Sequence, residues 1–141
     1  MDDLALAKKT MDEEGLALCV VCSGKEIFRS CKIGVLPLYL AYSQGLKFKD
    51  CCAADKVVGL GAAFFWSKLN IKSLSTKIIS EPAKEYLENN DIEISFEILT
   101  NRILDREGVE NCPVETLAKN STSFDEFLIG TKQFLEEKGL I

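Results

Sequence analysis

The sequence contains no histidine among its 141 residues. Histidine is the usual general base near neutral pH and the commonest zinc ligand in proteins. Its absence excludes serine–histidine–aspartate and cysteine–histidine catalysis within one chain, and it excludes metalloproteases that use the HExxH motif. Any acid–base catalysis would depend on Asp, Glu, Lys, Cys or Tyr side chains. We expect neither a bound metal nor another cofactor.

Long apolar runs and basic stripes are also missing. No apolar run reaches the length of a membrane span, and residues 1–14 are charged and amphipathic, unlike a signal peptide. The net charge is -5, whereas surfaces that bind nucleic acid are usually rich in lysine and arginine. We therefore expect a cytoplasmic protein that binds neither membranes nor nucleic acids. The length and the 47% hydrophobic content are typical of one soluble domain, spanning residues 1–141.

Six cysteines are present, and without an export signal we expect them to be reduced thiols. Cys19 and Cys22 form a CxxC motif within an apolar segment that predicts a strand. Residues three apart on a strand point to opposite faces, so the pair could not hold one metal ion without a bend. Two buried core cysteines are the simpler interpretation. Cys51 and Cys52 are also expected in a strand.

Hydrophobic periodicity and turn residues predict alternating strands and helices after an N-terminal helix and a β-hairpin. This order favours an α/β fold with a three-layer α-β-α arrangement, in which a mixed sheet of about five strands carries helices on both faces. The expected segments are helix 2–14, strand 16–22, turn 23–25, strand 26–30, helix 36–45, strand 48–55, helix 56–70, strand 73–80, helix 81–90, strand 92–99, and helices 112–120 and 123–140.

Two polar segments are expected to meet at one edge of this sheet. Ligands of open α/β sheets bind beyond the carboxyl ends of the strands. Asp55 and Lys56 are expected at the end of the third strand, and a polar connection, residues 100–111, follows the fifth. A lysine at a helix start opposes the helix dipole, which favours a role such as anion binding. Nearby Gly59 and Gly61 do not form a dinucleotide fingerprint, because the third glycine is missing.

The polar connection carries two cations and two anions within six positions. It is either a solvated loop with exposed ion pairs or a ligand loop in which an arginine makes a forked contact to a phosphate or carboxylate. Both interpretations stay open. The four residues are Arg102, Asp105, Arg106 and Glu107.

Three interpretations apply to the stretch NCPVE that follows. As a plain helix start, Asn111 caps the helix, Pro113 fits its first turn and Glu115 is a capping-box acid. As a reactive site, Cys112 lies near the positive end of a helix dipole, which favours the thiolate. As a metal site, Asp55, Cys112 and Glu115 would supply one sulfur and two oxygen ligands. Zinc prefers a ligand set with more nitrogen and sulfur atoms than this.

The segments DKVVGLGAAF, NRILDREG and CPVE resemble a bacterial family designated domain of unknown function 1893, from about the first helix to Glu115. The resemblance implies a cytidine-deaminase-like fold, in which two helix N-termini face each other and hold zinc.

The zinc signature of that fold is not matched in this sequence. Asp55 or Lys56 stands where the deaminase histidine would fall, and Val57 or Val58 stands near the catalytic glutamate. On the second helix, the cysteine precedes the proline, and a glutamate replaces the second cysteine. Nucleobase deamination is therefore disfavoured.

We consequently predict a binding module without catalytic zinc that holds a small anionic or nucleotide-like ligand between Asp55–Lys56 and residues 102–115. One alternative is an enzyme that uses Cys112 as a nucleophile or group carrier. Another is a structural module that forms homo-oligomers. The aromatic residues 64–66 are possible anchors for such self-association, although a core position is the simpler interpretation.

Overall fold

The computed structural model describes residues 1–101, 103 and 113–141. Its helices and strands occur in the predicted order, and the prediction of an α/β fold around a five-stranded mixed sheet is confirmed. The elements are α1 (Asp3–Glu14), β1 (Leu18–Cys22), β2 (Lys25–Ser30), α2 (Leu36–Ser43), β3 (Cys52–Val58), α3 (Leu60–Lys68), β4 (Ser73–Ser80), α4 (Glu81–Asn89), β5 (Glu93–Thr100), α5 (Pro113–Asn120) and α6 (Phe124–Glu137).

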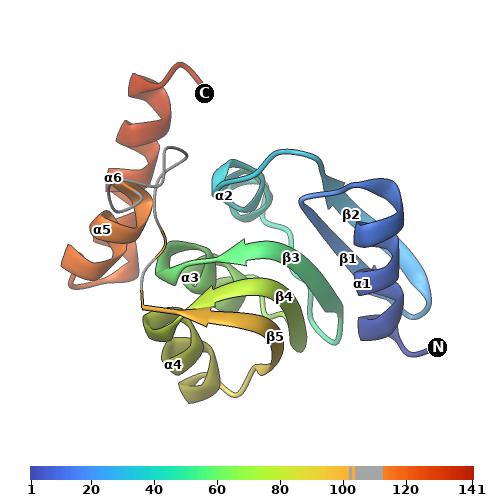
Figure 1. The fold of residues 1–141 in the computed structure, drawn as a ribbon. Helices are drawn as coiled ribbons and strands as arrows, with labels where there is room; N and C mark the ends of the chain where they lie inside the picture. The colour runs from blue at the N-terminus through green and yellow to red at the C-terminus, as the bar shows by residue number, and fades with distance from the viewer. Residues whose placement is uncertain (102, 104–112) are drawn as a thin grey trace.

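The strands lie in the order β2-β1-β3-β4-β5 (Figure 1). The first two form the predicted hairpin, whose turn residues Ser23 and Gly24 have φ angles of 52° and 77°, as a tight hairpin turn requires. Strand β1 pairs antiparallel with β3, while β3, β4 and β5 are parallel. The carboxyl ends of the three parallel strands therefore lie at the same end of the sheet, which we call its carboxyl edge. In Figure 1 these strand ends point toward α5.

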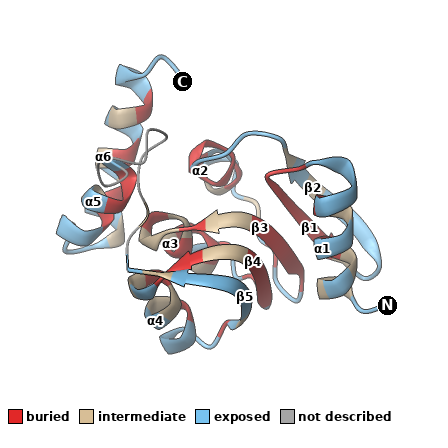
Figure 2. Ribbon diagram, viewed as in Figure 1, coloured by how far each residue is buried: buried red, intermediate tan, exposed pale blue. Residues whose placement is uncertain are grey.

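Helices cover the two faces of the sheet unequally. Among the described helices, α1 packs on one face, over β1 and β3, where Ala7, Met11 and Ala54 belong to a small buried cluster. Helices α2, α3 and α4 contribute to a much larger buried cluster on the other face. Figure 2 shows the buried residues concentrated in α2, α3, β1, β3 and β4, whereas β5 is largely exposed. Phe65 and Trp66 are fully buried in this cluster, so they form core and not an association surface.

Small residues on α3 allow α5 and α6 to pack closely against it. A side chain at Gly61 would bring its Cβ within 2.7 Å of Val114 on α5 and 3.1 Å of the Phe127 ring on α6. Phe64 extends the same contact, since its ring lies 5.0 Å from that of Phe127. The glycine therefore sets the distance between α3 and the helices at the carboxyl edge of the sheet.

The boundary between β3 and α3 was predicted wrongly. The strand continues to Val58, because Val57 and Val58 pair with Ile78 and Ile79 on β4, and the helix begins only at Leu60. A continuous apolar run fits a buried strand and a buried helix equally well, so periodicity alone could not place this boundary.

The cysteines of the CxxC motif point to opposite faces of the sheet, as predicted. Cys19 belongs to the small cluster beneath α1, whereas Cys22 packs against the large cluster. Cys52 opens β3, and Cys51 directly precedes that strand. Within the residues that the structure describes, no helix is long and apolar enough to cross a membrane.

Candidate functional site at the carboxyl edge of the parallel strands

The first turn of α5 meets the carboxyl ends of β3 and β4. Strand β3 ends one residue before Gly59, the N-cap of α3, and β4 ends at Ser80, the N-cap of α4. From α5, Glu115 reaches into this junction, and only 2% of its surface is exposed. Two helix N-termini and a buried carboxylate therefore converge at one place.

Both oxygens of the Glu115 carboxylate accept hydrogen bonds from other elements. The backbone N–H of Leu60, the first residue of α3, donates to Oε2. The hydroxyl of Ser80 donates to Oε1 at 3.2 Å, and the same Oγ accepts from the N–H of Ala83 at 3.3 Å. Glu115 thus satisfies an otherwise free donor of α3 and links α5 to the start of α4.

Gly59 leaves the space that the Glu115 carboxylate occupies. Its φ of -95° and ψ of -178° are extended values that any residue adopts, so the backbone does not require glycine here. A Cβ at this position would overlap Oε2 of Glu115 and lie 3.3 Å from Ile103. Gly59 and Glu115 are therefore sterically matched across the junction between α3 and α5.

The junction favours negative charge. The N-terminus of a helix carries partial positive charge, and its exposed N–H groups bind anions readily. Among the described residues, no lysine or arginine forms an ion pair with Glu115. Within the part of the chain that the structure describes, backbone and hydroxyl donors therefore hold this buried carboxylate.

Asp55 lies in the middle of β3, and the prediction that it ends this strand is wrong. It is 7% exposed, and the indole N–H of Trp66 donates to its Oδ2 at 2.9 Å. Burial raises the pKa of the Asp55 carboxyl to about 7, while hydrogen bonds from Trp66 and from backbone N–H groups lower it in part. Its contacts are thus with the core beneath α3.

Lys56 also lies within β3, and the prediction that it opens a helix is wrong. Its side chain is half-buried, and its backbone N–H donates to the carbonyl oxygen of Ala17 at 2.9 Å. The other candidates, Arg102, Asp105, Arg106, Glu107 and Cys112, lie outside the described residues. Convergence of Lys56 with the arginines on one anion therefore stays a prediction.

The structure brings Ser80 and Glu115 together, a contact that the sequence did not predict. Ser80 is a recognisable N-cap before Glu81 and Pro82, but its contact with Glu115 spans 35 positions in the chain and leaves no local signal. One of the three interpretations of the sequence made Glu115 a capping-box acid of its own helix, whereas its described hydrogen bonds, to Leu60 and Ser80, join other elements. Within residues 1–101, 103 and 113–141, no group of three or more Cys, Asp or Glu side chains is arranged to hold a metal ion.

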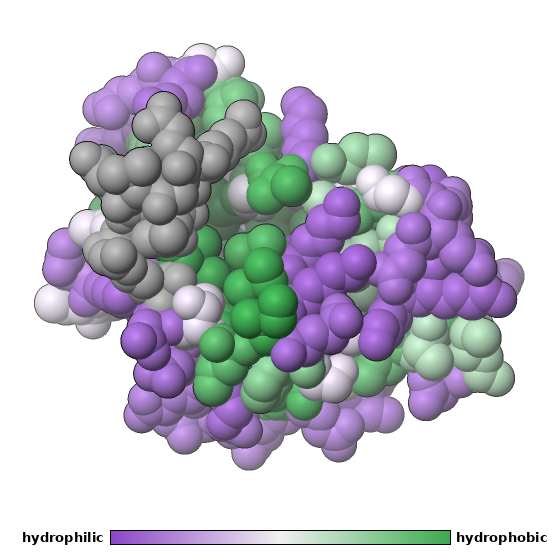
Figure 3. Space-filling model, viewed as in Figure 1, coloured by the Kyte–Doolittle hydropathy of each residue, from purple (hydrophilic) through white to green (hydrophobic). Residues whose placement is uncertain are grey.

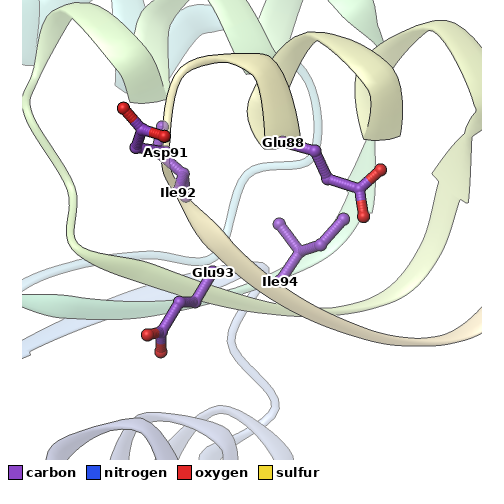
Figure 4. Close-up of a pocket in the computed structure, with 5 residues that line it drawn as sticks. All are labelled: Glu88, Asp91, Ile92, Glu93 and Ile94. Atoms are coloured by element: carbon purple, nitrogen blue, oxygen red, sulfur yellow. The ribbon is translucent and has the colours of Figure 1, made fainter.

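A surface depression of about 400 Å³ lies at the other end of the sheet, where α4 turns into β5. Its carboxylates point away from one another (Figure 4), so they do not form a common binding site for a cation. It is also remote from Glu115, because it adjoins the amino end of β5. The residues that line it are Glu88, Asp91, Ile92, Glu93 and Ile94.

Comparison with known proteins identifies relatives over nearly the whole chain. The family model of domain of unknown function 1893 (DUF1893, TM1506) matches residues 6–135. The fold is similar to the crystal structure of a DUF1893 family protein (TM1506) from Thermotoga maritima, with a TM-score of 0.84 and 25% sequence identity over 93% of this chain and 88% of that chain. None of the curated proteins matches.

Proposed function

We propose that this chain, which belongs to the DUF1893 family, binds a small anionic or nucleotide-like ligand at the carboxyl edge of β3 and β4 without a catalytic zinc. The observation that carries the proposal is the buried Glu115 carboxylate, which accepts hydrogen bonds from Leu60 and Ser80. These donors form an anion-binding position that the chain fills with its own side chain. The position also coincides with the usual ligand site of open parallel sheets.

A ligand anion and Glu115 would compete for the same donors. Rotation of the Glu115 side chain would free the N–H of Leu60, and a phosphate or carboxylate could then accept from it. Lys56 and Arg102 are the cations that we expect to balance the added charge. The facing N-termini of α3 and α5 are consistent with the deaminase-like arrangement that the sequence resemblance implies, and Glu115 stands where the second zinc-binding cysteine of that fold would be expected.

A thermal unfolding screen against nucleotides and sugar phosphates tests the proposal. We expect at least one phosphate-bearing compound to raise the melting temperature of the parent protein, because a ligand that binds only the folded state stabilises it. Arg102→Ala and Lys56→Ala should lose most of this shift. The matched control Lys9→Ala changes an exposed lysine on α1 and should keep it. The proposal fails if no anionic compound shifts the parent, or if both site variants keep the full shift.

Strand β5 favours a second candidate function, self-association. It is an edge of the sheet in the part that the structure describes, and it exposes 38% of Phe96, 55% of Ile98 and 42% of Leu99. Figure 3 shows apolar surface over β3 to β5 beside the polar surface of α1. An exposed apolar edge strand is a ready template for pairing with another chain.

A second copy could pair its β5 antiparallel to this one about a two-fold axis through Phe96. Ile94 would then lie opposite Ile98 of the second copy. Glu97 would lie opposite Ser95, so like charges would not face each other. Light scattering after size exclusion should show a dimer that Ile98→Lys converts to a monomer, while Ile129→Lys on α6 leaves it unchanged. A monomeric parent protein at high concentration would exclude this candidate.

A further inference from the structure

The last residue of β1, Cys22, lies close to Cys51, which directly precedes β3. The antiparallel register of β1 and β3 pairs Val20 with Ala53 and Val21 with Cys52. One step further along the same register, Cys22 lies opposite Cys51. The carbonyl oxygen of Cys51 accepts from the N–H of Lys72 at 2.9 Å, on the side away from β1.

The pair therefore has the geometry that a cross-strand disulfide requires. Since the backbone of Cys51 is directed away from β1, the two cysteines take a non-hydrogen-bonded position, where opposite Cα atoms lie about 4.5 Å apart. This value falls within the range of about 4.4–6.8 Å that disulfides span. Both side chains also belong to one face, because Cys51 is part of the large buried cluster and Cys22 packs against it.

The other described cysteines are placed differently. Cys19 lies on the opposite face, and its thiol donates to Glu26 Oε1 at 3.7 Å. Cys52 accepts from the hydroxyl of Ser73 at 3.0 Å. Cys31 is exposed beyond the end of β2. Within the described ranges, the register therefore singles out Cys22 and Cys51 as partners.

We propose that Cys22 and Cys51 form an oxidation site that closes a cross-strand disulfide when the chain meets a peroxide. The half-buried Cys22, as its thiolate, attacks one oxygen of hydrogen peroxide. The O–O bond breaks, and Cys22 becomes a sulfenic acid while one water forms. The sulfur of Cys51 then attacks that of Cys22, the S–O bond breaks, and a second water leaves with the thiol proton. Two thiols lose two hydrogens in total, and one peroxide is reduced to two waters.

The surroundings of Cys51 determine the order of these steps and their reversibility. Burial, together with the neighbouring Cys22 thiol, raises the pKa of the Cys51 thiol to about 12. Cys51 therefore stays protonated near neutral pH and closes the disulfide slowly. A thiol with a high pKa is also a slow leaving group, so the disulfide should be reduced slowly once formed. The bond would fix the β1–β2 hairpin to β3, at the opposite end of the sheet from Glu115.

The test is oxidation of the full chain with hydrogen peroxide, followed by alkylation of the remaining thiols and tryptic digestion without a reductant. We expect one cross-linked species that joins residues 10–25 to residues 50–56. It should persist in Cys19→Ser, Cys31→Ser and Cys52→Ser. It should be lost in Cys22→Ser, a change at a half-buried position that should not prevent folding.

The melting temperature supplies a second readout. We expect it to rise on oxidation of the parent protein, because a cross-link restricts the unfolded chain, and to return to its starting value after full reduction. Oxidised Cys22→Ser should show no rise. The proposal is overturned if the cross-linked species is absent, if it survives in Cys22→Ser, or if Cys22 pairs instead with Cys31 or Cys112. Each result is independent of ligand binding at the carboxyl edge.

Discussion

Replacement of Gly59 by alanine should break the hydrogen bond by which Glu115 on α5 holds the start of α3. The new Cβ would overlap Oε2 of Glu115 and lie 3.2 Å from its Cδ, so the carboxylate must move away from the N–H of Leu60. A hydrogen bond to a charged group contributes about 1.5–3 kcal/mol. With the weakened Ser80 contact added, we expect Gly59→Ala to lower the free energy of unfolding by about 2–4 kcal/mol.

A double-mutant cycle with Glu115→Ala isolates this contact from other effects of the substitution. Alanine is a poorer N-cap than glycine by about 0.5–1 kcal/mol, and this cost, together with the close contact to Ile103, should remain when the carboxylate is absent. Urea unfolding of the parent, the two single variants and the double variant should therefore give a coupling energy of about 2 kcal/mol between positions 59 and 115. An equal cost of Gly59→Ala in both backgrounds would refute the steric argument.

Three further predictions follow from the cited residues. The raised pKa of Asp55 means that the folded state holds a proton that the unfolded state releases, so its contribution to stability falls as the pH rises from about 4 to about 7. In urea unfolding, this decrease in the free energy of unfolding should amount to up to about 1.4 kcal/mol for each pH unit, and Asp55→Asn should abolish it. An unchanged pH dependence in Asp55→Asn would show that Asp55 does not cause the decrease. Cys112 should react faster with iodoacetamide at neutral pH than the buried Cys19 and Cys51, as peptide mass analysis can show, and slower labelling would remove the case for a reactive thiol. Elemental analysis of protein purified without chelator should find no stoichiometric zinc, and one tightly held zinc per chain would contradict this.

The arrangement of the sheet could be predicted because the local signals agreed with it. Gly15 ends α1 with a φ of 64°, and Pro82 lies in the first turn of α4 after the N-cap Ser80. These residues have conformations or hydrogen bonds that depend on near neighbours in the chain, so sequence alone reveals them. The hairpin at Ser23 and Gly24 belongs to the same class.

The candidate site could be predicted only in part, because it depends on contacts between distant segments. The sequence placed Glu115 in the right helical turn. It also predicted a ligand site at the carboxyl edge of the sheet, which stays a prediction. It gave no indication that Glu115 would accept a hydrogen bond from Leu60, 55 positions earlier. It also misplaced Asp55, whose pKa is raised by burial beneath α3 and lowered in part by the hydrogen bond from Trp66. Only the packed structure determines these two contacts.

The most direct test of the central claim is the affinity of the carboxyl edge for an anion when Glu115 loses its charge. Isothermal titration of a nucleoside monophosphate into the parent protein, Glu115→Gln and the exposed control Glu85→Gln would measure it. A neutral amide competes less strongly for the N–H of Leu60 and does not repel the incoming phosphate, so Glu115→Gln should bind about tenfold more tightly or better. Glu85→Gln should match the parent protein. Equal or weaker binding by Glu115→Gln would contradict the account.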